Sequence, residues 1–530
     1  MSPGAQHSPP IRGNKTLTPE SLLLKHSLSE LPTQKRSFIK MRVSTWGQVA
    51  SGLLISLLAA CGGGGGGGNY GSMPLAPTVN FSQPAAAATI NFGQAMTVAW
   101  SSAYTSSCTA STSSAAAGSF TGMQMTSGSV TVVPTAPGSY TYTVDCTGSG
   151  GTKSTSTTAT VTPNLLAALA PTGAILTVGS TVDPVLGETN PYGLAIAPAT
   201  VGLITKGDLV VCNFNDGTGK EGFGTTIIGL HPGATPAAPY RIAQSAVLQG
   251  CNALAMLPDD SISAAAWTPN VNPLVSATGT LGAPYAGDTF AQPWGEAFVA
   301  ATATQPAALY VSNAPANKGV VAVGGTIDRI SLDANNAQTS FTEILTGLCS
   351  GGSPGSIFGP AGLTYDVSSD TLYLVDSSSA SVIAIAGVSS VPKDGIVANG
   401  QCSATTPTPV PTFSGPSMAS VRVIAHGAPF VTPISAALLK NGDLVVGNGD
   451  IGVAAASNTT NLLIEISPVL PGGFVGQPVQ VEAGAPGALF GLAATVNDQG
   501  NQIIYFNDDT TNALMQLGPV SSPSAGINPY

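Results

Sequence analysis

The sequence Asn190-Pro191-Tyr192-Gly193-Leu194-Ala195-Ile196 is followed by Gly207-Asp208-Leu209-Val210-Val211-Cys212-Asn213. The first segment opens with a turn signal and continues as a short apolar strand. Gly207-Asp208 is a second turn signal, and it opens a second strand that ends in Asn. Variants of this pair of strands recur to the end of the chain, so the fold is decided by how many pairs there are and how they join.

The opening segment occurs six times, and its third residue stands at positions 193, 253, 295, 362, 435 and 491. The mean spacing of about 60 residues exceeds the ~40–50 of common propeller blades, which predicts inserted loops near residues 268–290 and 386–418. A second strand is expected after each opener, at 208–211, 261–265, 309–311, 372–375, 443–446 and 503–506. The pattern predicts an all-β fold with a six-bladed β-propeller over residues 170–520.

The order of the strands predicts how the propeller closes. Residues 174–179 have the pattern of a fourth strand but precede the first opener, and only a Pro/Ser/Gly tail, 521–530, follows the last third strand at 513–517. We therefore expect the N-terminal strand to join the last blade, which removes exposed sheet edges. A seven-bladed ring is the alternative, and a parallel β-helix fits worse because the repeats are too long.

Residues 170–520 resemble the NHL-type propellers of bacteria, whose repeats carry Pro-x-Gly-Ile/Leu-Ala and then Leu-Tyr-Val-x-Asp/Asn. Pro191–Ala195 and Leu309–Val311 match these two motifs, whereas the second opener lacks Pro and Gly and the fifth has Ser435 in place of Gly. The resemblance implies the fold and brings no assigned reaction.

Composition argues against two function classes. Mean hydropathy is +0.28, yet no run of about 18 apolar residues follows Cys61, so a multi-span membrane protein is not expected. From Cys61 onward the chain has nine Lys and Arg against 24 Asp and Glu, a net charge of −15. An acidic surface repels phosphate backbones, so we expect no nucleic-acid partner.

The first 60 residues indicate a cellular address. Residues 1–40 lack periodicity and are either a disordered leader or a region upstream of a true start at Met41. Residues 41–60 have the pattern of a signal peptide, because basic residues precede an apolar segment, 49–60, that is too short to span a bilayer.

The segment ends Leu58-Ala59-Ala60-Cys61-Gly62, which resembles the bacterial lipobox. The resemblance implies cleavage before Cys61, lipidation of its sulfur and amine, and an anchor in the membrane. Gly rather than Asp at position 62 favours the outer membrane, facing the periplasm or the exterior. An ordinary signal peptide with a chance Cys is the alternative. Residues 61–77, with seven consecutive glycines, are expected to form a flexible tether.

Residues 78–163 show short alternating strands at 97–100, 129–133, 139–144 and 159–161, which predicts an antiparallel β-sandwich around Trp100. The segment resembles bacterial Ig-like domains in the run Val-x-Trp-Ser-Ser, Ser-Cys-x-Ala-Ser and Tyr-x-Val-x-Cys-x-Gly. Here the order is Trp, Cys, Cys, so the resemblance is to the architecture. We expect a spacer, with carbohydrate or protein binding as the alternative.

Six of the seven cysteines follow Cys61, and an even number fits disulfides in an oxidising compartment. Six cysteines allow fifteen pairings. The pairs that we expect are Cys108–Cys146, Cys212–Cys251 between neighbouring blades, and Cys349–Cys402.

Polar residues end the second strands. In an antiparallel meander these ends share one face with the loops that enter the first strands, and that face collects Asn213, Asp216, Asn313, Asp376, Asn448, Asp450, Asn507 and Asp508. Asn and Asp cap strand ends by bonding to local backbone, which is the simpler interpretation. The alternative is a ring of oxygen ligands for a cation such as Ca²⁺.

The remaining motifs are weak. Tyr192, Trp294 and Phe490 stand at openers, where they either pack between blades or form a stacking platform for a glycan or peptide. His231 and His426 lack metal-ligand spacing, and we expect solvent-exposed side chains. Gly351–Gly355 matches G-x-S-x-G but lies in a loop with no helix pattern behind it, so a catalytic elbow is not expected.

Two functions follow from this sequence. One is a lipid-anchored envelope protein whose propeller is a non-catalytic scaffold for a ligand, protein or glycan. The alternative is a metal-dependent hydrolase or lyase, similar to the sugar-lactonase propellers.

Overall fold

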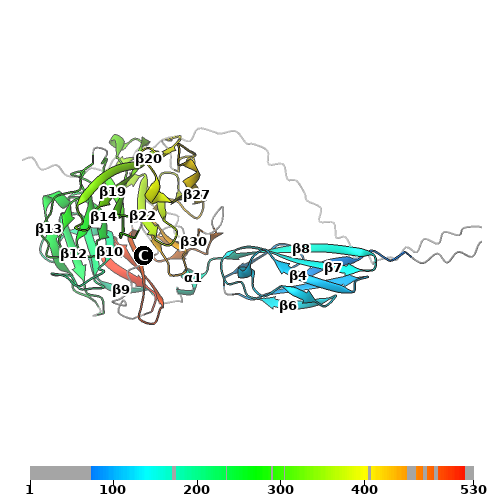
Figure 1. The fold of residues 1–530 in the computed structure, drawn as a ribbon. Helices are drawn as coiled ribbons and strands as arrows, with labels where there is room; N and C mark the ends of the chain where they lie inside the picture. The colour runs from blue at the N-terminus through cyan, green and yellow to red at the C-terminus, as the bar shows by residue number, and fades with distance from the viewer. Residues whose placement is uncertain are drawn as a thin grey trace, which may run out of the picture. The chain divides into compact units, whose positions relative to one another are not determined.

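The computed structural model describes residues 73–92, 94–169, 175–233, 236–287, 290–303, 305–403, 407–449, 461–468, 474–482 and 488–519. The predicted leader, the signal peptide, the lipidation site Cys61, most of the tether, Asp450 and the C-terminal tail lie outside these residues. Among the described residues, the regular secondary structure is almost entirely β-strand (Figure 1).

The N-terminal part has two sheets around one core, and they are antiparallel as predicted except that β2 pairs in parallel with β8. One sheet has the order β1-β3-β6, and the other has the order β2-β8-β7-β4-β5. Their bounds are Thr78–Gln83 (β1), Ala88–Asn91 (β2), Met96–Ala103 (β3), Ser107–Thr112 (β4), Gly122–Gln124 (β5), Gly128–Val132 (β6), Gly138–Gly148 (β7) and Gly151–Thr162 (β8). Inward and outward residues alternate along β3 and β7, which is why the period-two pattern located them.

The core of the sandwich is aromatic. Trp100 contacts Phe120 edge-on at 5.6 Å between ring centroids, and Phe120 contacts Tyr142 at 5.8 Å. The Trp100 indole N–H donates to the Met125 carbonyl at 3.1 Å, so its polar atom is satisfied. The Cys108–Cys146 disulfide joins β4 to β7, which are neighbours in the same sheet.

The C-terminal part consists of six sheets, which form the blades of a propeller. The blades are β10–β13 (Thr189–Ile196, Leu209–Asn215, Thr226–Leu230, Tyr240–Gln244), β14–β16 (Cys251–Met256, Ile262–Ala266, Leu274–Val275) and β17–β20 (Pro293–Val299, Ala307–Asn313, Ala322–Leu332, Gln338–Ser353). The fourth is β22–β24 with β27 (Pro360–Asp366, Thr371–Asp376, Ser381–Ala386, Val421–His426), and the fifth is β28–β32 (Pro433–Leu438, Leu444–Asn448, Leu462–Ser467, Phe474–Val475, Val479–Gln480). The sixth is β33–β35 (Ala488–Val496, Gln502–Asp508, Ala513–Leu517) with β9 (Ile175–Ser180). Short strands β21 (Ser356–Phe358), β25 (Ile396–Ala398) and β26 (Phe413–Ser414) extend the third sheet.

The ring closes as the order of strands predicted. The first strands of the blades, β10, β14, β17, β22, β28 and β33, each contact the next, and β33 contacts β10. The sixth blade is completed by β9, which pairs antiparallel with β35 in the register Met515↔Thr177 (Figure 1). The helix α1 (Leu165–Leu169) packs on the fifth and sixth blades through the fully buried Leu166.

The Gly of the opener is required by the close approach of neighbouring blades. A Cβ atom at Gly295 would lie 2.1 Å from the Ala361 carbonyl oxygen of the next blade, and one at Gly491 would lie 2.4 Å from that of Tyr192. The fifth blade has Ser435 instead, and its hydroxyl donates to the Leu489 carbonyl at 2.6 Å. The serine that replaces glycine here therefore forms a hydrogen bond between the fifth and sixth blades.

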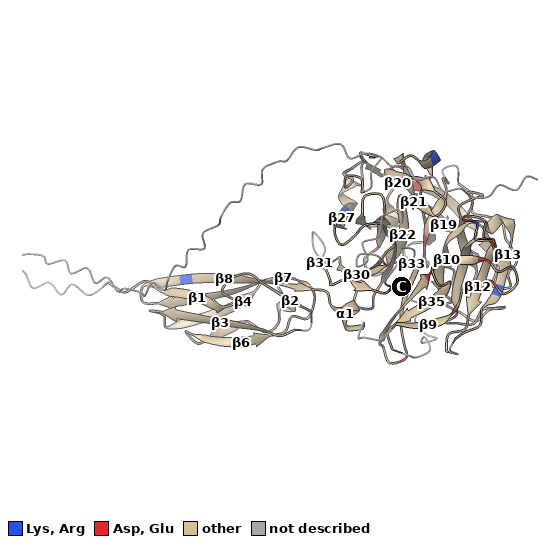
Figure 2. Ribbon diagram, turned by 180° about the vertical axis from the view of Figure 1, so that it is seen from behind, with Lys and Arg blue, Asp and Glu red and all other residues tan. Residues whose placement is uncertain are grey.

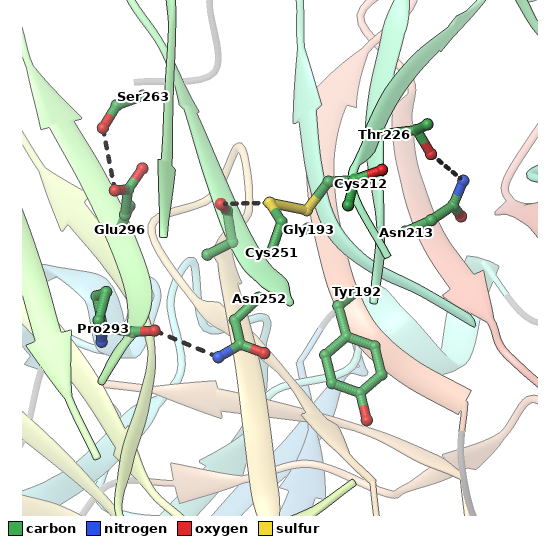
Figure 3. The surroundings of a disulfide bond; sticks show 12 residues. Tyr192, Gly193, Cys212, Asn213, Thr226, Cys251, Asn252, Ser263, Pro293 and Glu296 are labelled. Carbon is green, nitrogen blue, oxygen red and sulfur yellow. Dashed lines mark hydrogen bonds between the residues drawn. A yellow bond between two sulfur atoms is a disulfide. The ribbon is translucent and has the colours of Figure 1, made fainter. Parts of the chain in front are cut away.

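Similar bonds tie other blades together (Figure 3). The Cys212–Cys251 disulfide joins β11 to β14, and the Asn252 side-chain amide donates to the Pro293 carbonyl at 3.2 Å. The Ser312 hydroxyl donates to the Ala361 carbonyl at 2.6 Å. Asn507 donates to the Tyr192 and Gly193 carbonyls, so it holds the sixth blade on the first. These bonds satisfy edge groups of the inner strands that their own sheets leave unpaired.

Candidate functional site

The polar residues that end the second strands occupy one register position. Asn213, Asn313, Asp376 and Asn448 pair with the Pro that opens their own blade, and Asp508 pairs with Ala488. They therefore lie on the face that we predicted, the one where the first strands begin. The equivalent residue of the second blade is Ala266, which pairs with Cys251.

These side chains form hydrogen bonds with nearby groups. The Asn448 carbonyl oxygen accepts from the Val431 and Thr432 amides, and Asp376 accepts from Ser378 and Ser379. Asn313 donates to Thr326 and Asp328 and accepts from the Ala291 amide. Such bonds hold the loops that enter the first strands. Asp508 likewise accepts from Thr511, and exposed Asp216 closes its own turn by accepting from Thr218 and Lys220.

Aromatic rings fill the same end of the inner strands. Tyr192 is sandwiched between Phe214 and Phe490, with ring centroids 4.3 and 3.9 Å away and planes within 5° of parallel. Both faces of the Tyr192 ring are thus covered by protein. Trp294 is buried in a cluster with Trp267 and Ile357, so these opener aromatics pack between blades.

The G-x-S-x-G segment closes a hairpin between β20 and β21 rather than a strand-to-helix elbow. His426 ends the outer strand β27 and is exposed. The imidazole of His231, 58% exposed, makes a 2.5 Å contact through Nδ1 with the carboxylate of buried Asp208, which also accepts from the Tyr240 hydroxyl. His231 is therefore exposed as expected but is held in one orientation.

A cavity lies among the inner strands of the propeller. It encloses about 350 Å³ and is lined by residues from all six blades. Its middle level is built from small side chains, since one register position carries Ala195, Ala255, Ala297, Thr364, Ala437 and Ala493. Small residues at this position leave the axis open, and we refer to the space as the central channel.

The central channel extends away from the Asn-rich face. Its lining begins one residue after each opener Gly, at the level of Leu194, and continues past the ends of the strands to Ala300 and Val367. Val367 is 47% exposed, which places the mouth where first strands turn into second strands. The site predicted from the sequence lies at the opposite end, where Tyr192 and Trp294 pack.

Among the described residues that line the central channel, Glu296 is the only Asp, Glu, Lys, Arg or His. The equivalent residues of the other blades are Leu194, Leu254, Leu363, Ala436 and Leu492. Glu296 is only 7% exposed, and its Oε1 accepts from Ser263 at 3.0 Å and from Asn272 (Figure 3). Its Oε2 is enclosed and has no hydrogen-bond partner of normal geometry.

Burial dominates the electrostatics of Glu296. Removal from water raises the pKa of its carboxyl group to about 8, and hydrogen bonding by Ser263, the Ala255 backbone and Asn272 only partly opposes the rise. Burial therefore favours the protonated form of this carboxyl group. Opener patterns did not reveal Glu296, although a Glu where the other blades have Leu or Ala was a visible signal.

All three predicted disulfides are confirmed, because Cys349 is bonded to Cys402 in addition to the two pairs above. Within the described ranges, no three His, Cys, Asp or Glu side chains gather in an arrangement suited to a metal ion. The described residues also contain no helix long and apolar enough to cross a membrane. Charged residues are sparse along the ribbon (Figure 2).

No known family model matches the sequence, and no curated protein matches it. Among solved structures, the chain is similar to virginiamycin B lyase from Staphylococcus aureus, with 12% identity and a TM-score of 0.36 over 65% of this chain and 99% of that one. A gluconolactonase from Xanthomonas campestris has 12% identity and a TM-score of 0.41, covering 65% and 88%. Calcium-binding regucalcin from Agrobacterium tumefaciens has 13% identity and a TM-score of 0.38, covering 66% and 98%. These likenesses are too distant to assign a ligand or a reaction to this chain.

Proposed function

We propose that the protein is an envelope lipoprotein whose propeller binds a small, largely apolar molecule in the central channel without transforming it. The observation that carries this proposal is the channel itself. Its volume of about 350 Å³ falls within the ~300–1,000 Å³ of typical ligand sites, and all six blades contribute to its wall.

The chemistry of the channel fits such a ligand. Leu, Ala, Ile and Met side chains form most of the wall, and none of the lining residues is Lys, Arg or His. The inner strands are the terminal strands of their sheets, so their edges also present backbone N–H and C=O groups toward the axis. Apolar walls with a few polar groups are typical of small-molecule sites.

The cellular setting is part of the proposal. Three disulfides indicate an extracytoplasmic location, where thiols are oxidised. The lipid anchor at Cys61 and the outer membrane rest on the lipobox resemblance. The sandwich, proposed to be Ig-like, then serves as a spacer between the anchor and the propeller.

The test is calorimetric titration of the full chain with n-hexanol, a neutral probe with seven heavy atoms. We expect saturable binding with a Kd of the order of ~1 mM, which corresponds to ~0.6 kcal/mol per heavy atom. Val367→Trp places a large ring at the channel mouth and should abolish binding. Val320→Trp is the matched control, because Val320 is 61% exposed and does not line the channel. Binding that survives Val367→Trp, or no binding at all, would overturn the proposal.

One observation favours a second candidate, a hydrolase or lyase of the sugar-lactonase propeller type. A carboxyl group with a pKa of about 8 is suited to general-acid catalysis near neutral pH. Elemental analysis of the purified protein separates the two functions. Stoichiometric, tightly held Ca²⁺ or Zn²⁺ would favour the enzyme, whereas the binding function needs no metal.

A further inference from the structure

One end of the N-terminal sandwich carries large exposed apolar side chains. Two turns form this end, β3 to β4 and β7 to β8, and they touch, because a Cβ atom at Gly148 would lie 2.0 Å from the Tyr104 carbonyl oxygen. The segment before β1 crosses the same turns, since a Cβ atom at Gly150 would lie 2.2 Å from the Leu75 carbonyl oxygen. We call this end the sandwich tip. Its exposed apolar residues are Met73, Leu75, Tyr104 and Met125, with 90, 59, 59 and 76% of their surface exposed.

The four side chains of the tip belong to one surface. Met73, Leu75 and Tyr104 line the same groove. Met125 lies beside them, because the carbonyl of the residue after it accepts a hydrogen bond from Ser102 near the end of β3. Contiguous apolar side chains on a protein surface mark a site of contact with a protein, a membrane or a ligand.

Tyr104 is the residue of the tip that the fold explains least. Its φ is 60°, a left-handed conformation that Gly and Asn adopt more readily than an aromatic residue. The ring is more exposed than buried, so packing within the sandwich does not offset this cost. Residues held in such conformations cluster at functional positions. An aromatic ring with a polar hydroxyl is typical of the interface between a membrane and water.

The tip is the end of the sandwich at which the chain arrives from Cys61. Met73 follows Cys61 by 73 − 61 = 12 residues, which span at most about 42 Å. Strand β8 then leads away from the tip, and its 12 residues carry the chain about 36 Å toward the start of the propeller. A lipid on Cys61 therefore tethers the sandwich by its tip. Contact between the tip and the bilayer becomes intramolecular, so a weak apolar contact is sufficient.

The charge of the sandwich permits contact with anionic lipids. Between residues 73 and 162 the sequence has one acidic and one basic residue, Asp145 and Lys153, and their charges cancel. From residue 163 onward it has eight Lys and Arg against 23 Asp and Glu, so this part carries 8 − 23 = −15. An anionic lipid surface repels the acidic part and does not repel the neutral sandwich.

We infer that the sandwich tip docks on the phospholipid bilayer that holds the lipid anchor, with Leu75, Tyr104 and Met125 at the boundary between headgroups and acyl chains. This inference rests on the proposed lipoprotein and adds a membrane-contacting surface to it. Apolar faces of this kind enter the boundary by about 5–10 Å. The sandwich then fixes its own orientation on the membrane in addition to acting as a spacer.

The experiment measures contact between the tip and acyl chains by tryptophan fluorescence. The full chain with Tyr104→Trp is expressed in a bacterium that processes lipoproteins and is reconstituted in vesicles of phosphatidylcholine and phosphatidylglycerol. Bromine on the acyl chains quenches a tryptophan that touches them, and we expect the emission added by Tyr104→Trp to fall about two-fold or more. Val320→Trp, at a 61% exposed position of the propeller, is the matched control and should keep its emission. Adding Leu75→Asp and Met125→Asp to Tyr104→Trp should largely restore the emission.

The outcomes separate docking of the tip from the proposed function. Mass spectrometry of the reconstituted protein reports acylation of Cys61, and an unmodified Cys61 would overturn the proposed lipoprotein and the docking with it. Acylation without quenching in Tyr104→Trp would overturn the docking alone, and it is the result expected if the tip binds another protein instead. Equal quenching in Tyr104→Trp and Val320→Trp, or quenching that survives the two Asp substitutions, would also overturn it. Unchanged midpoints of urea unfolding verify that the variants are folded.

Discussion

Glu296 should make the stability of the propeller depend on pH in a way that Glu296→Gln abolishes. The carboxyl pKa is about 8 in the folded protein against 4.5 in the unfolded chain. Between these values the folded state holds a proton that the unfolded state has lost, so its contribution to stability is fully present below pH 4.5 and is lost as the pH rises through about 8. The two pKa values differ by 3.5. At about 1.4 kcal/mol for each pKa unit, the largest change in the free energy of unfolding is about 5 kcal/mol.

The assay is urea unfolding of both proteins at several pH values from 4.5 to 9, followed by the fluorescence of Trp267 and Trp294. Other carboxyl groups with raised pKa values, such as Glu465 at about 7 and Asp509 at about 8, act in both proteins, so the difference between the two curves isolates Glu296. We expect the variant to gain about 3–5 kcal/mol relative to the wild type between pH 5 and pH 9. If the free energy of unfolding changed with pH in the same way in both proteins, Glu296 would not be a buried acid with a raised pKa.

Three further results are expected from the blade contacts. Asn507→Ala removes the donor to the Tyr192 and Gly193 carbonyls and should lower the free energy of unfolding by about 1–3 kcal/mol, whereas Asn441→Ala, which removes an exposed amide away from the closure, should cost less. Replacing Cys212 and Cys251 together by Ala opens a loop of 39 residues and should cost about 4 kcal/mol in urea unfolding, a loss that addition of reductant to the wild type should reproduce. Thr177→Pro should cost about 3 kcal/mol if β9 closes the ring, because proline removes a donor and fits poorly in a paired strand, and an unchanged unfolding midpoint would contradict the closure.

The strand pattern was sufficient to predict the ring. Apolar strands that begin at Pro-x-Gly and end at Asn locate first and second strands, since turn residues and apolar runs depend on local backbone preferences. The position of residues 174–179 predicted the join with the last blade, because they have the pattern of a fourth strand before the first opener and no strand pattern follows the last third strand. The pairing of Cys212 with Cys251 followed from their places in neighbouring blades.

The end of the propeller at which the central channel opens was not predictable in the same way. Asn and Asp at strand ends drew attention to one face, yet Asn448 and Asp376 hold loops there through local bonds. One end of a channel is closed when side chains from distant parts of the sequence pack together there. Tyr192 and Phe490 are such a pair. Turn residues did not predict Glu296, because it stands at an apolar position that follows them in the other blades.

The most direct test of the channel as the ligand site is a crystal structure of the full chain with n-hexanol. Our account predicts that the alcohol lies along the axis of the ring, among the lining residues that all six blades contribute, with Val367 at the mouth. A ligand bound instead on the Asn-rich face, with the axis filled by protein side chains, would contradict it.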